Sequence, residues 1–198
     1  DTSWNESLKA IRSKKCLYEI YRDTYIDMYE KKNQYLTEGN QILEIGSGGG
    51  FLKELYPFII TSDITQINGV DMVVNAEQIP FENNSLDSIF AMHVIHHIPD
   101  ITKFLDEAVS GLKPGGGIEP YWGPFASFLF TKIHPEGFDK TAKQWINLNS
   151  STPNDYNQAL SYILLKRDRK VFEERYPSIE IVYHKPFNCL RYIATGGL

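Results

Sequence analysis

Residues 42–52 have the sequence ILEIGSGGGFL, in which a short apolar run leads into glycines and then into a helix-forming run. Glycines after a strand let the backbone turn sharply and approach a ligand closely, and the helix that follows adds N–H donors. A dinucleotide-binding loop has the pattern GxGxxG, whose third glycine falls at position 51 when counted from Gly46. Position 51 is Phe51, so this loop does not fit a dinucleotide pyrophosphate. A glycine turn without any ligand is the alternative.

Around this loop, short apolar runs alternate with helical ones, which is typical of a parallel sheet built from β-α-β units. We expect helices over residues 4–36 of an N-terminal segment 1–38, and at residues 51–56, 101–112 and 155–176. We expect strands at residues 41–45, 58–62, 70–74, 86–92, 179–183 and 190–194, with a fifth in chain order after the helix 101–112. The prediction is a single α/β domain over residues 1–198, doubly wound, with a mostly parallel, seven-stranded Rossmann-like sheet and helices on both faces.

That fifth strand is expected to be nearly absent. The sequence KPGGG at residues 113–117 should end the preceding helix, and only Ile118 then separates the glycines from Glu119 and Pro120. One residue cannot cross a sheet in which strands need about five. We therefore expect either a deleted strand or, in preference, a few residues missing from the sequence after Gly117. The ending GGL at residues 196–198 suggests a truncated tail in the same way.

The composition limits the class of protein. With 198 residues, 42% of them hydrophobic, the chain can bury a full core, and its formal net charge of −5 argues against a nucleic-acid binder. Cys16 and Cys189 are the only cysteines, too few for a disulfide framework or a metal clip. The sequence has no apolar stretch of about 18 residues and no signal-peptide pattern, so we expect a cytoplasmic protein without a membrane segment.

Two further segments place polar side chains where a nucleoside could bind. Asp63 follows the second expected strand, where a carboxylate can accept both ribose hydroxyls of an adenosine, and Ile64 can pack on the adenine face. A turn or helix-capping role for Asp63 is the alternative. The other segment is NAEQIPF at residues 75–81, which begins with the polar side chain of Asn75.

Together these three segments, in this order and spacing over residues 40–117, resemble the class I S-adenosylmethionine (SAM)-dependent methyltransferases, in the methyltransferase-11-like branch. The resemblance implies that SAM is the cofactor, that the glycine loop packs against its methionine part, and that Glu44 lies near its ammonium group. Asn75 stands where the family usually has Asp. The cofactor-binding residues that the resemblance implies are Glu44, Gly46, Ser47, Gly48, Phe51, Asp63, Ile64, Asn75, Ala76 and Met92.

Histidines gather after the fourth strand, in the sequence MHVIHHIPD at residues 92–100. The pattern HxxHH is compatible with zinc, but no cysteine or acidic partner stands nearby at ligand spacing, so we predict no metal site. His97 is a candidate general base, because imidazole titrates near neutrality. Packing or capping is the alternative role for this histidine.

Residues 120–153 are rich in aromatic residues, Gly, Pro and His, and we expect them to form an irregular insertion that covers the acceptor site. The insertion follows the fifth strand, at the edge of the sheet where ligands bind in such folds. Tyr121, Trp122 and His134 are candidate acceptor-binding residues, and Glu119 and His134 join His97 as catalytic candidates. A small helical cap packed on the core is the alternative.

The expected function is methyl transfer from SAM to a small-molecule or sugar-like acceptor. The chain also looks like a bacterial methyltransferase subgroup that is loosely linked to cell-surface polysaccharide biosynthesis, through FLKE after the glycine loop, EPY at residues 119–121 and FNCLRY at residues 187–192. A non-catalytic SAM-binding or scaffold protein is one alternative. A nicotinamide-dependent oxidoreductase is another, disfavoured by Phe51.

Overall fold

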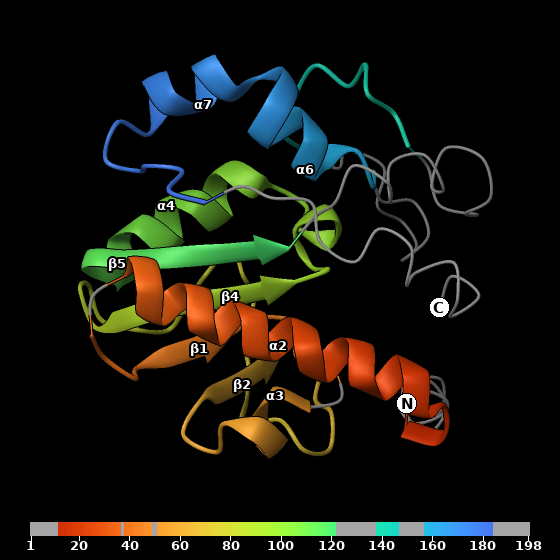
Figure 1. Ribbon diagram of the computed structural model, residues 1–198. Coiled ribbons are helices and arrows are strands. Elements are labelled where there is room, and N and C mark those ends of the chain that lie inside the picture. The colour runs from red at the N-terminus through yellow and green to blue at the C-terminus, as the bar shows by residue number, and fades with distance from the viewer. Residues whose placement is uncertain (1–11, 37, 49–50, 122–137, 147–156, 184–198) are drawn as a thin grey trace. The chain divides into compact units, whose positions relative to one another are not determined.

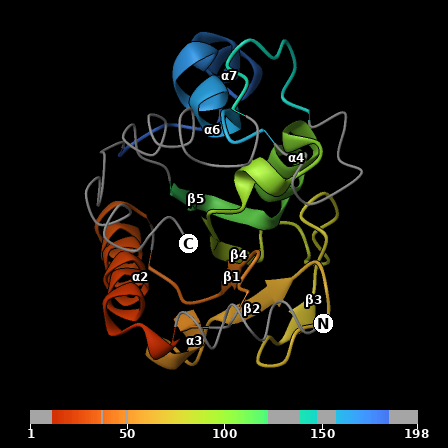
Figure 2. The ribbon, with the colours of Figure 1, turned by 90° about the vertical axis from the view of Figure 1, so that its right-hand side faces the viewer.

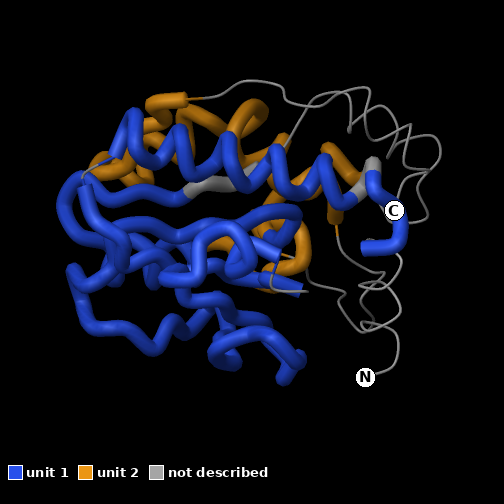
Figure 3. The backbone as a smooth tube through the Cα atoms, turned by 60° about the horizontal axis from the view of Figure 1, so that its bottom comes forward, with its two compact units in different colours: residues 1–94, 103–120 blue, residues 95–102, 121–198 orange. Residues whose placement is uncertain are grey.

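The computed structural model describes residues 12–36, 38–48, 51–121, 138–146 and 157–183. By its internal contacts the chain divides into two compact units (Figure 3), Asp1–Val94 with Lys103–Pro120, and Ile95–Thr102 with Tyr121–Leu198. Each unit is described by itself below. Whether the chain forms one domain over residues 1–198 stays a prediction.

A five-stranded sheet in the order β3-β2-β1-β4-β5 forms the centre of the first unit (Figure 1). The strands are β1 (Ile42–Glu44), β2 (Ile60–Asp63), β3 (Met72–Val73), β4 (Leu86–Met92) and β5 (Leu112–Tyr121). The first four pair in parallel, with Glu44 opposite Thr61 on one side and Phe90 on the other, and Asp63 opposite Val73. The carboxyl ends of these strands therefore meet at one edge of the sheet.

Every residue of β1 and β4 is buried, as expected for strands that have helices on both faces. Helix α2 (Lys15–Tyr35) packs with α3 (Phe51–Leu55) on one face, and α4 (Ile101–Gly111) lies on the other (Figure 2). The periodicity of α4 explains its position, because Phe104, Leu105 and Ala108 fall on one side of the helix and are buried. The doubly wound, mostly parallel α/β fold is thus confirmed.

The prediction that the fifth strand is nearly absent is wrong. Helix α4 ends at Gly111, and the chain continues directly as β5 through the glycines that were expected to form a turn. These glycines fit because β5 passes close to its neighbours: a Cβ on Gly117 would collide with Leu36, and one on Gly116 would crowd the Asp87 carbonyl oxygen. The hydroxyl of Ser88 on β4 donates to the Gly117 carbonyl oxygen at 3.1 Å.

The predicted number of seven strands is not reached among the described residues, which hold five. Residues 179–183 are irregular where a strand was expected. The N–H of Ile179 donates to the Tyr176 carbonyl oxygen in a turn, and Val182 and Tyr183 leave 48% and 40% of their surfaces exposed, so this segment lacks the burial of a sheet strand. The strand expected at residues 190–194 lies outside the described residues.

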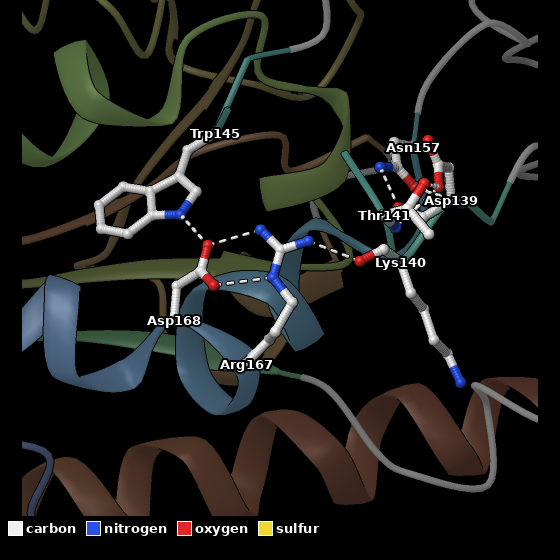
Figure 4. Close-up of polar contacts among 7 residues, drawn as sticks. All are labelled: Asp139, Lys140, Thr141, Trp145, Asn157, Arg167 and Asp168. Carbon is white, nitrogen blue, oxygen red and sulfur yellow. Dashed lines mark hydrogen bonds and ion pairs between the residues drawn. The ribbon is translucent and has the colours of Figure 1, made fainter. Parts of the chain in front are cut away.

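The second unit contains short helical segments instead of the continuous helix expected over residues 155–176. Within that range they are α6 (Leu160–Tyr162), the π-helical turn η2 (Ile163–Arg167) and α7 (Arg169–Arg175). The 3₁₀ helix η1 (Ile95–His97) also belongs to this unit. The break between η2 and α7 is held by Asp168, which accepts hydrogen bonds from the Trp145 indole at 3.0 Å and from the Arg167 guanidinium at 2.6 and 2.7 Å (Figure 4). Arg167 also donates to the Lys140 carbonyl oxygen.

Asp139 organises the loop beside this ion pair. Its carboxylate accepts from the N–H and hydroxyl of Thr141, and its backbone exchanges two hydrogen bonds with the Asn157 amide (Figure 4). Residues 138–146 of the expected insertion are therefore held by polar contacts within the segment and with Asn157 and Arg167. Within the described ranges, no helix is long and apolar enough to cross a membrane.

Candidate functional site

The glycine loop leaves β1 at Glu44 and is fixed to the strands on both sides. The N–H of Ile45 donates to the Phe90 carbonyl oxygen on β4, and the N–H of Ser47 donates to the Ser62 carbonyl oxygen on β2. The Ser47 hydroxyl in turn accepts from the N–H of Ser62 at 3.0 Å. The start of the loop is therefore a rigid part of the sheet edge, and the predicted cofactor residue Ser47 holds it there.

Glycine is required at Gly46 for two independent reasons. Its φ of 68° lies in the left-handed region that residues with a Cβ rarely adopt, and a Cβ at this position would collide with the Val94 side chain. Gly48, with φ of 53°, repeats the first constraint two residues later. The backbone after β1 thus turns through two left-handed positions that favour glycine, and at Gly46 there is also no room for a Cβ.

The carboxylate of Glu44 is buried beneath this loop without a hydrogen-bond partner. The residue is 1% exposed, and both of its carboxylate oxygens lack a partner. The pKa of this carboxyl is raised from 4.5 to about 7, mainly by burial and to a lesser extent by the charge of Asp63. The hydroxyls of Ser47 and Tyr25 lie near enough to lower the pKa, but neither forms a hydrogen bond of standard geometry with Glu44 and neither offsets the burial.

Asp63 lies at the predicted place, the carboxyl end of β2, and supports the glycine loop. Its Oδ2 accepts from the N–H of Gly48 at 3.2 Å, and its Oδ1 accepts from the N–H and hydroxyl of Thr65. The contact with Thr65 is the turn role that the sequence left open. The contact with Gly48 joins the two predicted cofactor segments, so Asp63 and the loop lie side by side. Binding of ribose hydroxyls by Asp63 stays a prediction.

The other predicted cofactor residues also gather at this edge. Ile64 is 62% exposed directly after Asp63, an unusual exposure for a large apolar side chain. Asn75 is exposed two residues after β3, where its side chain accepts from the N–H of Glu77, and Ala76 is buried. Met92 is buried at the end of β4. The sequence thus predicted which residues share an edge, and their contacts with a cofactor stay predictions.

Phe51 was predicted to contact the cofactor, and the structure places its ring against residues of α2 and of the segment just before it. The rings of Tyr18 and Tyr21 lie 5.9 Å from it, and the Arg12 guanidinium lies over it at 5.3 Å. Phe51 is buried by these contacts. These contacts therefore join the start of α3 to the N-terminal helix.

Tyr25 is a site residue that the sequence analysis missed. It falls within the helix predicted over residues 4–36, and on α2 it is 2% exposed. Its hydroxyl, however, lies beside Glu44, and burial together with that carboxylate raises its pKa well above 10. The only sequence signal was a tyrosine where the helix face needed an apolar residue, since a buried tyrosine hydroxyl needs a polar neighbour.

The histidines after β4 fall into the two units. His93, in the first unit, is exposed and has a φ of 56°, a left-handed conformation that is uncommon for histidine and that clusters at functional sites. In the second unit, the ring of the predicted base His97 lies 4.0 Å from that of His96, both on η1. No set of three or more His, Cys, Asp or Glu side chains suited to a metal occurs among the residues the structure describes.

The structure describes only part of the predicted acceptor site. Glu119 and Tyr121 lie on β5, and nothing is described of their side chains. Trp122 and His134 lie outside the described residues. The acceptor site over residues 120–153 therefore stays a prediction.

The segment around the glycine loop is similar to a known protein family. Residues 43–118 match the model of a family described as "Methyltransferase domain". The chain is 34% identical over 96 residues to a ubiquinone biosynthesis O-methyltransferase from Paramagnetospirillum magneticum, which covers 40% of this chain and 39% of that protein. It is 37% identical over 71 residues to a ubiquinone/menaquinone biosynthesis C-methyltransferase from Brucella canis, which covers 36% of this chain and 24% of that protein.

A solved SAM-dependent methyltransferase from Aquifex aeolicus superposes with a TM-score of 0.37 at 22% identity, covering 44% of this chain and 59% of that one. The chain spans well under half the length of the curated relatives named above. The segment that the family model matches holds the glycine loop, Asp63 and Asn75. Residues 43–118 of this chain are thus similar to methyltransferase domains.

Proposed function

We propose that this chain binds SAM at the carboxyl edge of its sheet and transfers the methyl group to a small-molecule acceptor. The observation that carries the proposal is the Glu44 carboxylate, buried and without a hydrogen-bond partner beneath the glycine loop. A buried carboxylate in this state is costly to the fold and is seldom kept without a function. A ligand with a cationic group would provide the missing partner, and SAM carries an ammonium group on its methionine part.

The surrounding residues suit the rest of such a ligand. Gly46 and Gly48 leave the backbone bare where a ligand approaches, Asp63 offers a carboxylate for the ribose, and Ile64 offers an exposed apolar surface for the adenine. Bound SAM supplies an activated methyl group on a sulfonium. The chain itself has to align the acceptor and keep water out, which is the main demand of such a displacement on a protein.

The acceptor cannot be taken from the relatives. Their printed names concern ubiquinone and menaquinone biosynthesis, but the matched segments cover at most 40% of this chain. We propose a polar, ring-bearing acceptor such as a saccharide, because residues 119–139 combine flat aromatic side chains with ionisable ones. His93 adds an exposed imidazole at the end of β4, where a proton acceptor would be useful for a hydroxyl acceptor.

Calorimetric titration tests the cofactor. We expect SAM to bind in the micromolar range, which corresponds to about −8 kcal/mol, and NAD to bind little or not at all. Binding of NAD without SAM would contradict the proposal. Formation of S-adenosylhomocysteine with a panel of saccharide and phenolic acceptors then separates an enzyme from a protein that only binds SAM.

Two substitutions test the acceptor site. Trp122→Ala and His134→Ala should reduce turnover while leaving SAM affinity unchanged, because both residues are proposed to contact the acceptor. His93→Ala provides a comparison from a separate segment of the chain. A joint loss of stability and SAM affinity in the first two variants would show that residues 120–153 serve as packing, and the acceptor would then have to be sought near His93.

A further inference from the structure

The segment of residues 75–81 starts beside Asp63, at the carboxyl edge of the sheet. The N–H of Val74, just before the segment, donates to the Asp63 carbonyl oxygen at 2.9 Å. The chain then turns, and the N–H of Gln78 donates to the Asn75 carbonyl oxygen at 2.9 Å. The predicted cofactor residue Asn75 is therefore the first residue of a turn whose start is fixed to β2.

The far end of this turn is fixed by a side chain from helix α4. Ile79, directly after the turn, is 6% exposed, and a backbone N–H in a buried segment needs a hydrogen-bond partner. Pro80 disfavours the helical conformation at Ile79, so the turn does not continue as a helix. The half-buried Glu107 provides the partner, because its Oε2 accepts from the N–H of Ile79 at 2.9 Å.

Helix α4 also holds the chain beyond the turn, through its last residues. The N–H of Asn84 donates to the Ser110 carbonyl oxygen at 3.0 Å, and the Ser110 hydroxyl donates to the Asn83 side chain at 2.7 Å. These bonds guide the chain into β4. The bond from Glu107 is the one that reaches the end of the turn, and Ser110 offers a comparison on the same helix.

The strand order decides what this turn would face in a complex. In the order β3-β2-β1, Glu44 lies on one side of Asp63, and Asn75, two residues after β3, follows on the other. A ligand with its ammonium group near Glu44 and its ribose on Asp63 therefore directs its base toward the turn. The exposed side chain of Ile64 is next to Asp63 on the way.

We propose that Glu107 is a positioning residue of the cofactor site, which holds the turn so that Asn75 and Ala76 meet the edge of the adenine. The inference rests on the proposed function. Loss of Glu107 leaves the start of the turn bound to β2 and frees its end. Hydrogen bonds weaken steeply outside their preferred geometry, so the protein then reads the base less closely.

Substitutions at Glu107 separate its hydrogen bond from its charge. Glu107→Ala removes the acceptor. Glu107→Gln keeps a side-chain oxygen at the same reach without the charge, and Glu107→Asp keeps the charge on a side chain one carbon shorter. Ser110→Ala is the matched control, because it removes a bond between α4 and Asn83 that does not involve the turn.

The test compares the binding of S-adenosylhomocysteine and S-inosylhomocysteine by calorimetry. Both ligands carry the same ammonium group and ribose, and they differ only in the base, where hypoxanthine replaces adenine. The ratio of their dissociation constants therefore reports how closely the protein reads the base. Partial loss of the folded state lowers the binding of both ligands equally and leaves this ratio unchanged.

We expect the wild type to prefer S-adenosylhomocysteine by about tenfold or more, since a site that pairs with a base rejects one with altered hydrogen-bonding groups. Glu107→Ala and Glu107→Asp should bind S-adenosylhomocysteine roughly five- to tenfold more weakly and reduce the preference to about twofold or less. Glu107→Gln and Ser110→Ala should keep the wild-type preference.

An unchanged preference in Glu107→Ala or Glu107→Asp would overturn the inference. The same loss of preference in Glu107→Gln or Ser110→Ala, or a wild type that binds both ligands equally, would overturn it as well. Failure of the wild type to bind either ligand would instead contradict the proposed function.

Discussion

Two carboxylates are buried on neighbouring strands of the same sheet and lie toward opposite edges of it. Glu44 is the last residue of β1, and Asp87 is the second residue of β4. Their exposed fractions are 1% and 4%. They share the same strand pairing, since Ile42 lies opposite Ser88 and Glu44 opposite Phe90. Burial alone therefore does not distinguish them.

The hydrogen bonds of Glu44 and Asp87 distinguish the two carboxylates. Asp87 accepts from the Lys113 ammonium at 2.7 Å and from the N–H of Gln41 at 2.8 Å, whereas Glu44 has no hydrogen-bond partner. Burial raises the pKa of both carboxyls, but around Asp87 the bonds from Lys113 and Gln41 outweigh it and the net pKa is lowered. The net pKa of Glu44 is raised to about 7.

The difference fits a structural role for Asp87 and the cofactor-binding role proposed for Glu44. Asp87 joins the starts of β1, β4 and β5, so its charge contributes to the fold. Glu44 is destabilising as long as it is charged and alone, which is expected of a site that waits for a ligand. Changes at the two positions should therefore have opposite effects on stability and binding.

The largest expected effect is on the pH dependence of stability. The pKa of Glu44 rises from 4.5 in the unfolded chain to about 7 in the fold, so the folded state binds the extra proton between these values. The contribution of Glu44 to the free energy of unfolding therefore falls as the pH rises from about 4.5 to 7, by about 3 kcal/mol, and is constant above. Glu44→Gln should remove this loss and be more stable than the wild type at pH 8. Urea unfolding of both proteins at several pH values measures it, with Glu38→Gln, an exposed carboxylate on the same unit, as control. Equal slopes with pH in wild type and Glu44→Gln would contradict the role assigned to Glu44.

The next effect is on binding. Glu44→Gln should weaken SAM by roughly 10- to 100-fold at pH 8, because it removes the negative charge that is proposed to meet the ammonium group. Calorimetry on the folded variant measures the change, and Glu38→Gln should bind like the wild type. A variant that gains stability and keeps its affinity would show that Glu44 is buried for another reason.

Asp87 should behave in the opposite way. Asp87→Ala leaves the Lys113 ammonium and the N–H of Gln41 without their partner, so the free energy of unfolding should fall by about 2 kcal/mol. SAM affinity should stay within twofold of the wild type, since Asp87 lies at the other edge of the sheet. Denaturant unfolding and calorimetry on one preparation test both statements. A large loss of affinity would mean that the two edges are coupled through β1 and β4.

The sequence predicted the carboxyl edge well because its signals are local. A strand followed by glycines specifies a turn whose φ values favour glycine, and the structure has such values at Gly46 and Gly48. An aspartate at the end of the next parallel strand must lie beside that turn, which the bond from Gly48 to Asp63 bears out. Position along a strand was enough in both cases.

The remaining features depend on distant neighbours. Tyr25 looked like one more residue of an apolar helix face, because nothing near it in sequence indicates Glu44. The glycines of β5 looked like a helix stop, because their close approach to Leu36 and β4 appears only once the sheet is assembled. The π-helical turn at Ile163–Arg167 is a local deviation that apolar spacing cannot distinguish from a regular helix.

Lys113 provides the smallest and most specific test, because the sequence assigned it to a turn and the structure places it on β5 beside Asp87. Its side chain is 41% exposed, so water screens its charge and its ion pair contributes less than a buried one. Lys113→Met should lower the free energy of unfolding by about 1 kcal/mol or less, because Asp87 keeps the N–H of Gln41. In a double-mutant cycle with Asp87→Ala, the losses in free energy of unfolding of the two single variants should sum to more than the loss in the double variant. Each single variant removes the same bond between Lys113 and Asp87. If the losses of stability were additive, the Lys113 ion pair would contribute nothing to Asp87. The hydrogen bond from Gln41 would then account for the difference between Asp87 and Glu44.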